Sequence, residues 1–210
     1  MISVLIADDH PIVRQGLKQI LAGESDVKIV GEAQNTQEIF KLIGTQPWDI
    51  VILDLSMPDR GGLEVLNDLH RDFPQLPILI LSMHPEDQFA VRVLKAGASG
   101  YMTKDSAPEE LVNAIRKILA GHKYISSALA EKLAKDLEAG TKKLPHETLS
   151  DREYHVMCML ASGKTVSEIA KELSLSVKTI STYRARVLEK MGMKNNAELI
   201  HYVLKNKLAY

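Results

Sequence analysis

A small set of polar side chains gives this 210-residue chain the means to handle a phosphoryl group: Asp8, Asp9, Asp54, Ser82 and Lys104. Three carboxylates held close together repel one another, and at least one would protonate unless a cation lay nearby. A hard divalent cation such as Mg²⁺ takes one or two carboxylate oxygens and leaves a position for a phosphoryl oxygen. With that cation and Lys104 beside it, Asp54 is placed to attack phosphorus, and the Ser82 hydroxyl could hold the resulting acyl phosphate.

The elements that must position these side chains form a regular series. Apolar runs predict five strands, at 2–7, 27–33, 50–54, 78–82 and 100–103. Each is followed by a segment with helical spacing, at 11–21, 37–43, 63–69, 88–96 and 109–119. Near-continuous apolar strands that alternate with helices indicate a parallel sheet covered on both faces, a doubly wound α/β domain. Functional residues of such domains lie beyond the carboxyl ends of the strands, where the five polar residues stand.

Composition excludes several other classes of protein. With 45% hydrophobic and 25% charged residues, the chain has the balance of a globular protein long enough for two domains. No apolar run approaches the roughly 20 residues that span a bilayer, and the first residues lack a basic signal region, so we expect a cytoplasmic protein without a membrane partner. A single cysteine, Cys158, excludes an internal disulfide framework and a multi-thiolate metal site.

The two halves of the chain differ in charge. Residues 1–145 hold 16 Lys and Arg against 20 Asp and Glu, whereas residues 146–210 hold 10 against 7. An acidic front and a basic back predict different partners, with nucleic acid a candidate for the second.

Four stretches together resemble the receiver domain of two-component response regulators over residues 1–122: Asp8-Asp9, Ile52 to Asp59, Leu81-Ser82 and Gly97 to Lys104. The resemblance implies a flavodoxin-like fold, with Asp54 as the phosphoacceptor and Asp9 as a direct Mg²⁺ ligand. It also implies that Asp8 lies near the metal and that the Ser56 backbone carbonyl completes the site.

Ser82 and Tyr101 match the switch pair of receivers. A phosphoryl group on Asp54 offers acceptor oxygens that would draw the Ser82 hydroxyl inward, vacating space for the Tyr101 ring. Asp105 follows Lys104 where many receivers have Pro, and the sequence leaves the geometry of that peptide bond open.

Beyond residue 122 the pattern changes to helices alone. Residues 123–145 predict a linker with a helix at 128–139, and residues 146–210 a small all-α domain. Ser150 and Glu153 have the spacing of a capping box, Thr165 to Glu168 begins another helix, and Ser176 caps a third over 177–191. Two short helices around a tight turn are typical of a helix-turn-helix, whose second helix enters the major groove of DNA.

The third helix carries an excess of basic residues, which favours DNA binding over a plain helical bundle. The C-terminal segment, including Ser176 to Ile180 and Lys190-Met191-Gly192, resembles the LuxR-type DNA-binding domain, although Tyr183 stands where the family commonly has His. We predict these DNA contacts: Lys178, Thr179, Ser181, Thr182, Arg184 and Arg186. The last helix, 196–205, is predicted to supply a dimer surface from Leu199, Ile200, Val203 and Leu204.

Both resemblances together identify the chain as a member of the NarL/FixJ family of response regulators. They imply a transcription regulator rather than a turnover enzyme, phosphorylated by a sensor histidine kinase and bound to double-stranded DNA as a homodimer. A phosphohydrolase similar to the haloacid dehalogenases would need a second Asp where Ser56 stands, and the chain lacks the glycine-rich motifs of nucleotide-binding modules. A regulator that never uses phosphate stays open.

Overall fold

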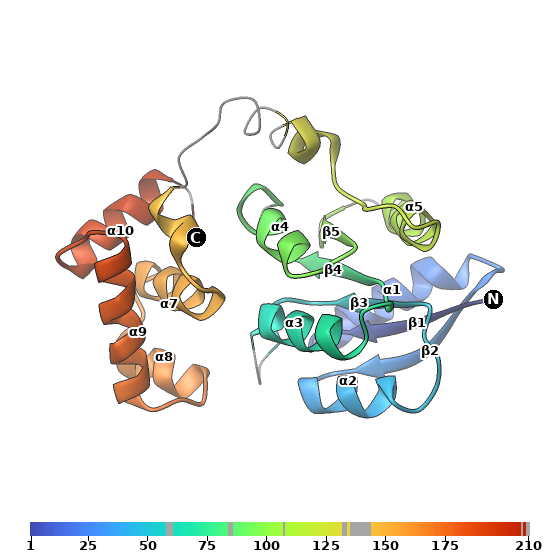
Figure 1. Ribbon diagram of the computed structural model, residues 1–210. Coiled ribbons are helices and arrows are strands. Elements are labelled where there is room, and N and C mark those ends of the chain that lie inside the picture. Colours follow the sequence, from blue (N-terminus) through green and yellow to red (C-terminus); the bar gives the residue numbers. More distant parts are fainter. Residues whose placement is uncertain are drawn as a thin grey trace. The chain divides into compact units, whose positions relative to one another are not determined.

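The computed structural model describes residues 1–57, 61–83, 86–106, 108–131, 134, 144–206 and 208. The chain forms two compact units, Met1–Lys135 and Asp136–Tyr210 (Figure 1). The first unit extends past residue 122, so it includes residues that the sequence assigned to the linker. In the part of the chain that is described, no helix is both long and apolar enough to cross a membrane.

The first unit is built on a five-stranded sheet in which every neighbouring pair is parallel. The strands are β1 (Ile2–Ala7), β2 (Val27–Ala33), β3 (Ile50–Leu53), β4 (Ile78–Ser82) and β5 (Gly100–Thr103). Their spatial order, β2-β1-β3-β4-β5, places the first strand inside the sheet. The predicted doubly wound architecture is confirmed, and strand three ends one residue earlier than expected.

Helices cover both faces of the sheet (Figure 1). They are α1 (Pro11–Ala22), α2 (Thr36–Ile43), α3 (Gly62–Asp72), α4 (Glu86–Lys95) and α5 (Pro108–Leu119). Alternate strand residues such as Ile6 and Ile52 pack with α1 and α5, whereas Leu5 and Leu53 pack with α2, α3 and α4. The central strands β3 and β4 are thus buried on both faces, which explains their continuous apolar sequence.

Leu55, two residues after the end of β3, packs tightly against the start of α3. The Gly62 N–H donates to the Leu55 carbonyl at 3.1 Å, and a Cβ on Gly62 would collide with the Leu55 backbone. The Asp54 N–H donates to the Ala7 carbonyl at 2.8 Å. These contacts fix the backbone on both sides of the Asp54 side chain.

Residues that follow α5 return to the edge of the sheet. Tyr124 forms a parallel bridge with Gly100, and its carbonyl accepts from the Tyr101 N–H at 3.1 Å. The Ser126 N–H donates to Glu86 Oε1 at 3.0 Å, and Leu129 is buried in the same apolar cluster as Tyr101. The predicted linker helix at 128–139 begins at residue 127, and its residues 132–133 and 135–139 lie outside the described residues.

The second unit contains helices alone among its described residues. They are the 3₁₀ turn η1 (Pro145–Thr148), α7 (Asp151–Ala161), α8 (Val166–Glu172), α9 (Val177–Lys190) and α10 (Asn196–Lys205). The capping box at Ser150, the helix start at Thr165 and the Ser176 cap of α9 are confirmed, and the start at Thr165 is also a capping box. These caps satisfy the first backbone donors of each helix.

The predicted dimer surface on α10 is partly wrong. Leu199 and Val203 are completely buried within the unit, because their face of α10 packs against α7. Leu204 is 58% exposed and Ile200 is half-buried. Within this unit, only Leu204 and part of Ile200 remain from the four predicted residues as surface for a partner.

Candidate functional site

The sheet brings the predicted acidic and basic residues to one edge. Asp8 and Asp9 follow β1, Asp54 follows β3, Ser82 ends β4 and Lys104 follows β5. Because β1, β3, β4 and β5 are successive neighbours, their carboxyl ends lie side by side. The residues therefore meet although they are distant in the sequence.

Lys104 joins two buried carboxylates. Its Nζ lies 2.7 Å from Asp8 Oδ2 and 2.9 Å from Asp54 Oδ2. The side chains are 6% exposed for Lys104, 3% for Asp8 and 0% for Asp54, so little water screens the three charges. The peptide bond after Lys104 is trans.

The pKa of both members of the central pair is displaced. Burial raises the pKa of Asp54 above its ordinary value, and this effect outweighs the lowering by the Lys104 hydrogen bond and charge. Burial alone would lower the pKa of Lys104, but hydrogen bonds to Asp54 and Asp8 raise it overall. Lys104 therefore stays an ammonium, and Asp54 depends on that ammonium for its negative charge.

The acidic cluster fits a divalent cation. Ligand atoms of Asp8, Asp9, His10 and Asp54 all lie within 4.8 Å of one another. Among the described residues, Oδ2 of Asp8 and Oδ1 of Asp9 are buried, and neither has a partner that meets strict hydrogen-bond geometry. Close to them lie Lys104 Nζ, 2.7 Å from Asp8 Oδ2, and His10 Nδ1, 2.8 Å from Asp9 Oδ1. Carboxylate oxygens with unused lone pairs are suitable ligands for a hard divalent cation.

Ser56, the predicted carbonyl ligand, is exposed and lies two residues after Asp54. Its backbone N–H donates to Asp54 Oδ1 at 3.1 Å, which helps to orient the carboxylate. A metal contact of its carbonyl oxygen stays a prediction.

Two residues of the site were missed from the sequence. His10 directly follows the two acids, and that adjacency was the available signal. Arg14 is only 6% exposed on α1, where it donates from a terminal guanidinium nitrogen to the Asp8 carbonyl at 2.7 Å and from Nε to Glu32 at 3.3 Å. In the sequence, the indication for Arg14 was a charged side chain between apolar residues of the predicted helix. Arg14 thereby anchors the loop that carries Asp8 and Asp9.

The predicted switch residues lie on adjacent strands. Ser82 is completely buried, and its carbonyl accepts from the Lys104 N–H at 2.8 Å. Tyr101 is 1% exposed and belongs to the apolar cluster under α2, α3 and α4. In this conformation the Tyr101 ring already occupies the interior.

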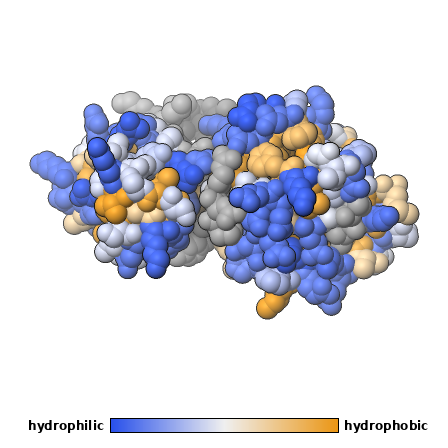
Figure 2. Space-filling view, turned by 90° about the horizontal axis from the view of Figure 1, so that it is seen from below, coloured by the Kyte–Doolittle hydropathy of each residue, from blue (hydrophilic) through white to orange (hydrophobic). Residues whose placement is uncertain are grey.

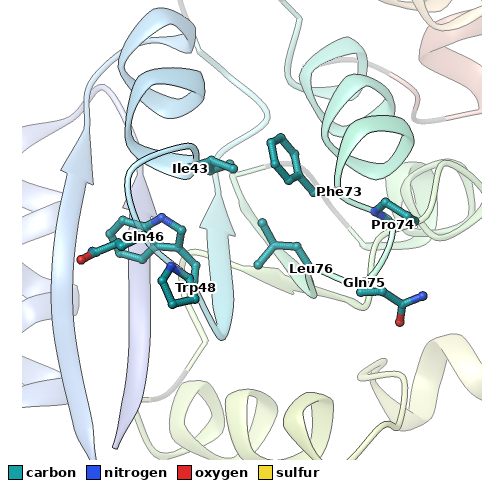
Figure 3. A pocket seen from close by; sticks show the side chains of 8 residues that line it. Ile43, Gln46, Trp48, Phe73, Pro74, Gln75 and Leu76 are labelled. Carbon is teal, nitrogen blue, oxygen red and sulfur yellow. The ribbon is translucent and has the colours of Figure 1, made fainter.

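A separate pocket lies at the amino ends of the strands, between the end of α2 and the end of α3 (Figure 3). It measures about 310 Å³ and is lined by Ile43, Gln46, Pro47, Trp48, Phe73, Pro74, Gln75 and Leu76. Because these residues precede β3 and β4 rather than follow them, the pocket is remote from Asp54. It carries no carboxylate, amine or imidazole, and is distinct from the site described above.

The second unit presents the predicted DNA-binding residues on a helix-turn-helix. α8 and α9 are joined by a turn in which Ser174 has a positive φ of 52° and the Leu175 N–H donates to the Ala170 carbonyl at 2.9 Å. Lys178, Ser181, Thr182 and Arg186 are exposed on α9.

The face of the molecule in Figure 2 is largely hydrophilic, with smaller apolar areas.

Two predicted DNA contacts are partly engaged within the unit. Arg184 is half-buried, and its Nε donates to Asn196 Oδ1 at 2.6 Å. Thr179 is half-buried too, and its hydroxyl lies 2.8 Å from that of Ser176. Arg186 is therefore better placed than Arg184 to reach a phosphate.

Comparison with known proteins agrees with both units. The family described as response regulator receiver domain matches residues 4–116, and bacterial regulatory proteins of the luxR family match residues 147–203. The chain is 38% identical over 209 residues to the response regulator UvrY of Escherichia coli K12. The aligned residues cover 99% of this chain and 96% of UvrY.

Solved structures of one relative are similar over nearly the whole chain. RcsB of Salmonella enterica serovar Typhimurium, bound to promoter P1flhDC with the phosphomimetic BeF3-, has a TM-score of 0.70 and 31% identity, covering 96% of this chain and 98% of that chain. A structure of two RcsB dimers bound to two parallel DNAs has a TM-score of 0.61 and 31% identity, covering 96% and 97%.

Proposed function

Because this chain belongs to the response regulators that join a receiver domain to a LuxR-type DNA-binding domain, we propose that Asp54 is its phosphoacceptor. The observation that carries this assignment is the buried Asp54 carboxylate, paired with Lys104 at 2.9 Å beside the acidic cluster. The phosphodonor is a phosphohistidine of a sensor histidine kinase, the usual partner of this family.

In the transfer step, an Asp54 carboxylate oxygen attacks phosphorus while the bond from phosphorus to the donor nitrogen breaks. The products are an aspartyl phosphate and an imidazole that takes up a proton. The Lys104 ammonium balances the charge of Asp54 before the step and can follow the phosphoryl oxygens after it. The Ser56 N–H orients the carboxylate from its other oxygen.

Asp9, Asp54 and the Ser56 carbonyl are the residues that would hold Mg²⁺, with Asp8 close by. The cation supplies positive charge to the phosphoryl oxygens when it is bound. Arg14 keeps the Asp8 and Asp9 loop in place through its 2.7 Å bond to the Asp8 carbonyl.

Ser82 and Tyr101 transmit the change. The Ser82 hydroxyl donates to the new phosphoryl group, and this bond stabilises the arrangement in which the Tyr101 ring is buried. The Tyr101 N–H also donates to Tyr124, so the conformation of β5 is linked to the segment that leads toward the second unit.

The output is transcription regulation through double-stranded DNA. Exposed Lys178 and Arg186 contact phosphates, while Ser181 and Thr182 approach base edges in the major groove. The RcsB structures, which contain DNA and dimers, support a homodimer that binds two half-sites. Such a regulator works in the cytoplasm, where its DNA lies.

The assignment is tested with acetyl phosphate and Mg²⁺ as the phosphodonor system. Wild type should gain acid-labile phosphate and Asp54→Asn none, while Asp105→Asn, an exposed neighbour of Lys104, should label normally. Labelling of Asp54→Asn as strong as wild type would sink the assignment. DNA binding and oligomeric state should both change with acetyl phosphate, and a regulator indifferent to it would be one that does not use phosphate.

A further inference from the structure

An imidazole lies next to the acidic cluster and has no part in the mechanism above. His10 follows Asp9 and precedes α1. Its Nδ1 lies 2.8 Å from Asp9 Oδ1 and 3.3 Å from Asp8 Oδ1. Its backbone N–H donates to the same Asp8 oxygen at 2.8 Å, which holds the ring at the mouth of the cluster.

These separations match those of neighbouring ligands on one metal ion. Two ligand atoms at right angles in an octahedron, each about 2.1 Å from the ion, are about 3.0 Å apart. The two distances from His10 Nδ1 lie on either side of that value. An ion that binds Asp9 therefore has the imidazole nitrogen in reach.

The fold itself does not require the imidazole. The His10 side chain is 60% exposed, and at the N-cap position of α1 it makes no capping hydrogen bond. Asn, Asp, Ser or Thr would cap that helix better. The remaining structural role is donation of a hydrogen bond to Asp9, which a glutamine amide could reproduce.

We propose that His10 is a nitrogen ligand of the cation site and shifts its preference from Mg²⁺ toward borderline metals such as Co²⁺. The inference rests on the proposed function, because it takes Asp9 as a cation ligand. Mg²⁺ prefers oxygen ligands, whereas imidazole raises the affinity for later divalent metals. A site of carboxylates and a carbonyl alone would discriminate less strongly between the two ions.

The test measures Co²⁺ and Mg²⁺ binding to the full chain by calorimetry. In His10→Gln, Co²⁺ affinity should fall by about tenfold or more, as for other groups that tune metal sites, while Mg²⁺ affinity changes far less. Wild type loaded with Co²⁺ should show a hyperfine-shifted imidazole N–H proton in its NMR spectrum. That resonance should be missing from His10→Gln and present in His122→Gln, an exposed histidine of the same unit.

The outcomes separate this inference from the function on which it rests. If His10→Gln binds Co²⁺ as wild type does, or keeps the shifted resonance, His10 only donates to Asp9 and the inference is overturned. If Asp9→Asn leaves the binding of both cations unchanged, the cation site itself is wrongly placed. Loss of Co²⁺ preference in His10→Gln, together with loss of both cations in Asp9→Asn, supports both.

Discussion

Lys104 lies 2.7 Å from Asp8 and 2.9 Å from Asp54, so one ammonium pairs with two carboxylates that follow different strands. Removing one partner from a buried ion pair leaves an uncompensated charge. Lys104 is thus a structural residue of the metal-free receiver as well as the ligand that we propose for the phosphoryl group.

Lys104→Met should lower the free energy of unfolding of the first unit by about 3–5 kcal/mol in the presence of EDTA. Mg²⁺ should restore part of that loss, because the cation replaces the missing positive charge and binds only the folded form. Urea unfolding followed by Trp48, the single tryptophan, reports this unit. Lys95→Met, which changes an exposed residue at the end of α4, is the control. If Lys104→Met were as stable as wild type in EDTA, the pairing of Lys104 with Asp8 and Asp54 would not stabilise the fold.

Acid should weaken the second unit through Glu153. Burial raises the pKa of Glu153, but bonds from Lys190 and Ser150 outweigh burial and lower that pKa overall. The ionised form therefore stabilises the folded state above pH 4.5, the ordinary pKa value, and this contribution is lost as the pH falls through the lower folded pKa.

Calorimetry of wild type and Glu153→Gln should show this dependence. The variant should be less stable near neutral pH by up to about 1 kcal/mol, because Gln can still serve in the capping box but loses the charge that pairs with Lys190. The difference should shrink as the pH falls below 4.5. Glu189→Gln, exposed on α9, should show no such trend. If the difference in stability between wild type and Glu153→Gln stayed constant across the acid range, ionisation of Glu153 would not explain it.

Leu199 and Leu204 lie on opposite sides of the boundary between core and surface: on α10, Leu199 is buried and Leu204 is exposed. Leu199→Ala should cost about 2–5 kcal/mol of stability, because a completely buried leucine leaves a cavity. Leu204→Ala should cost little stability and weaken any dimer formed through α10, since that side chain is 58% exposed. Thermal unfolding and sedimentation distinguish the two effects. Equal effects of both substitutions on association would argue against the exposed face as the contact.

Arg186 and Arg184 should differ in DNA binding. Arg186→Ala should reduce the slope of log affinity against log salt by about 1, the value expected for one lost phosphate contact. Arg184→Ala should act largely through stability, because its Nε is bonded to Asn196 at 2.6 Å. Titrations at several salt concentrations, with thermal unfolding alongside, test the pair. An unchanged slope for Arg186→Ala removes it from the phosphate contacts.

The receiver could be predicted in detail because its information is local. Most strands are apolar runs, and four of the five lead into a polar residue at the carboxyl ends of the sheet, so the cluster of Asp8, Asp54 and Lys104 followed from topology. His10 and Arg14 were missed because their partners are fixed by loop geometry and by a buried side chain. The spacing on α10 showed an apolar face but not that α7 covers Leu199 and Val203.

The bridge between Gly100 and Tyr124 has a consequence for domain exchange. Residues 124–129 complete the edge of the receiver sheet, through backbone bonds at Tyr124 and the burial of Leu129 beside the Tyr101 cluster. A chimera joined at residue 122 would expose an unpaired strand edge and open that cluster to water. A chimera that joins this receiver to another DNA-binding domain should therefore keep residues 123–131 of this chain.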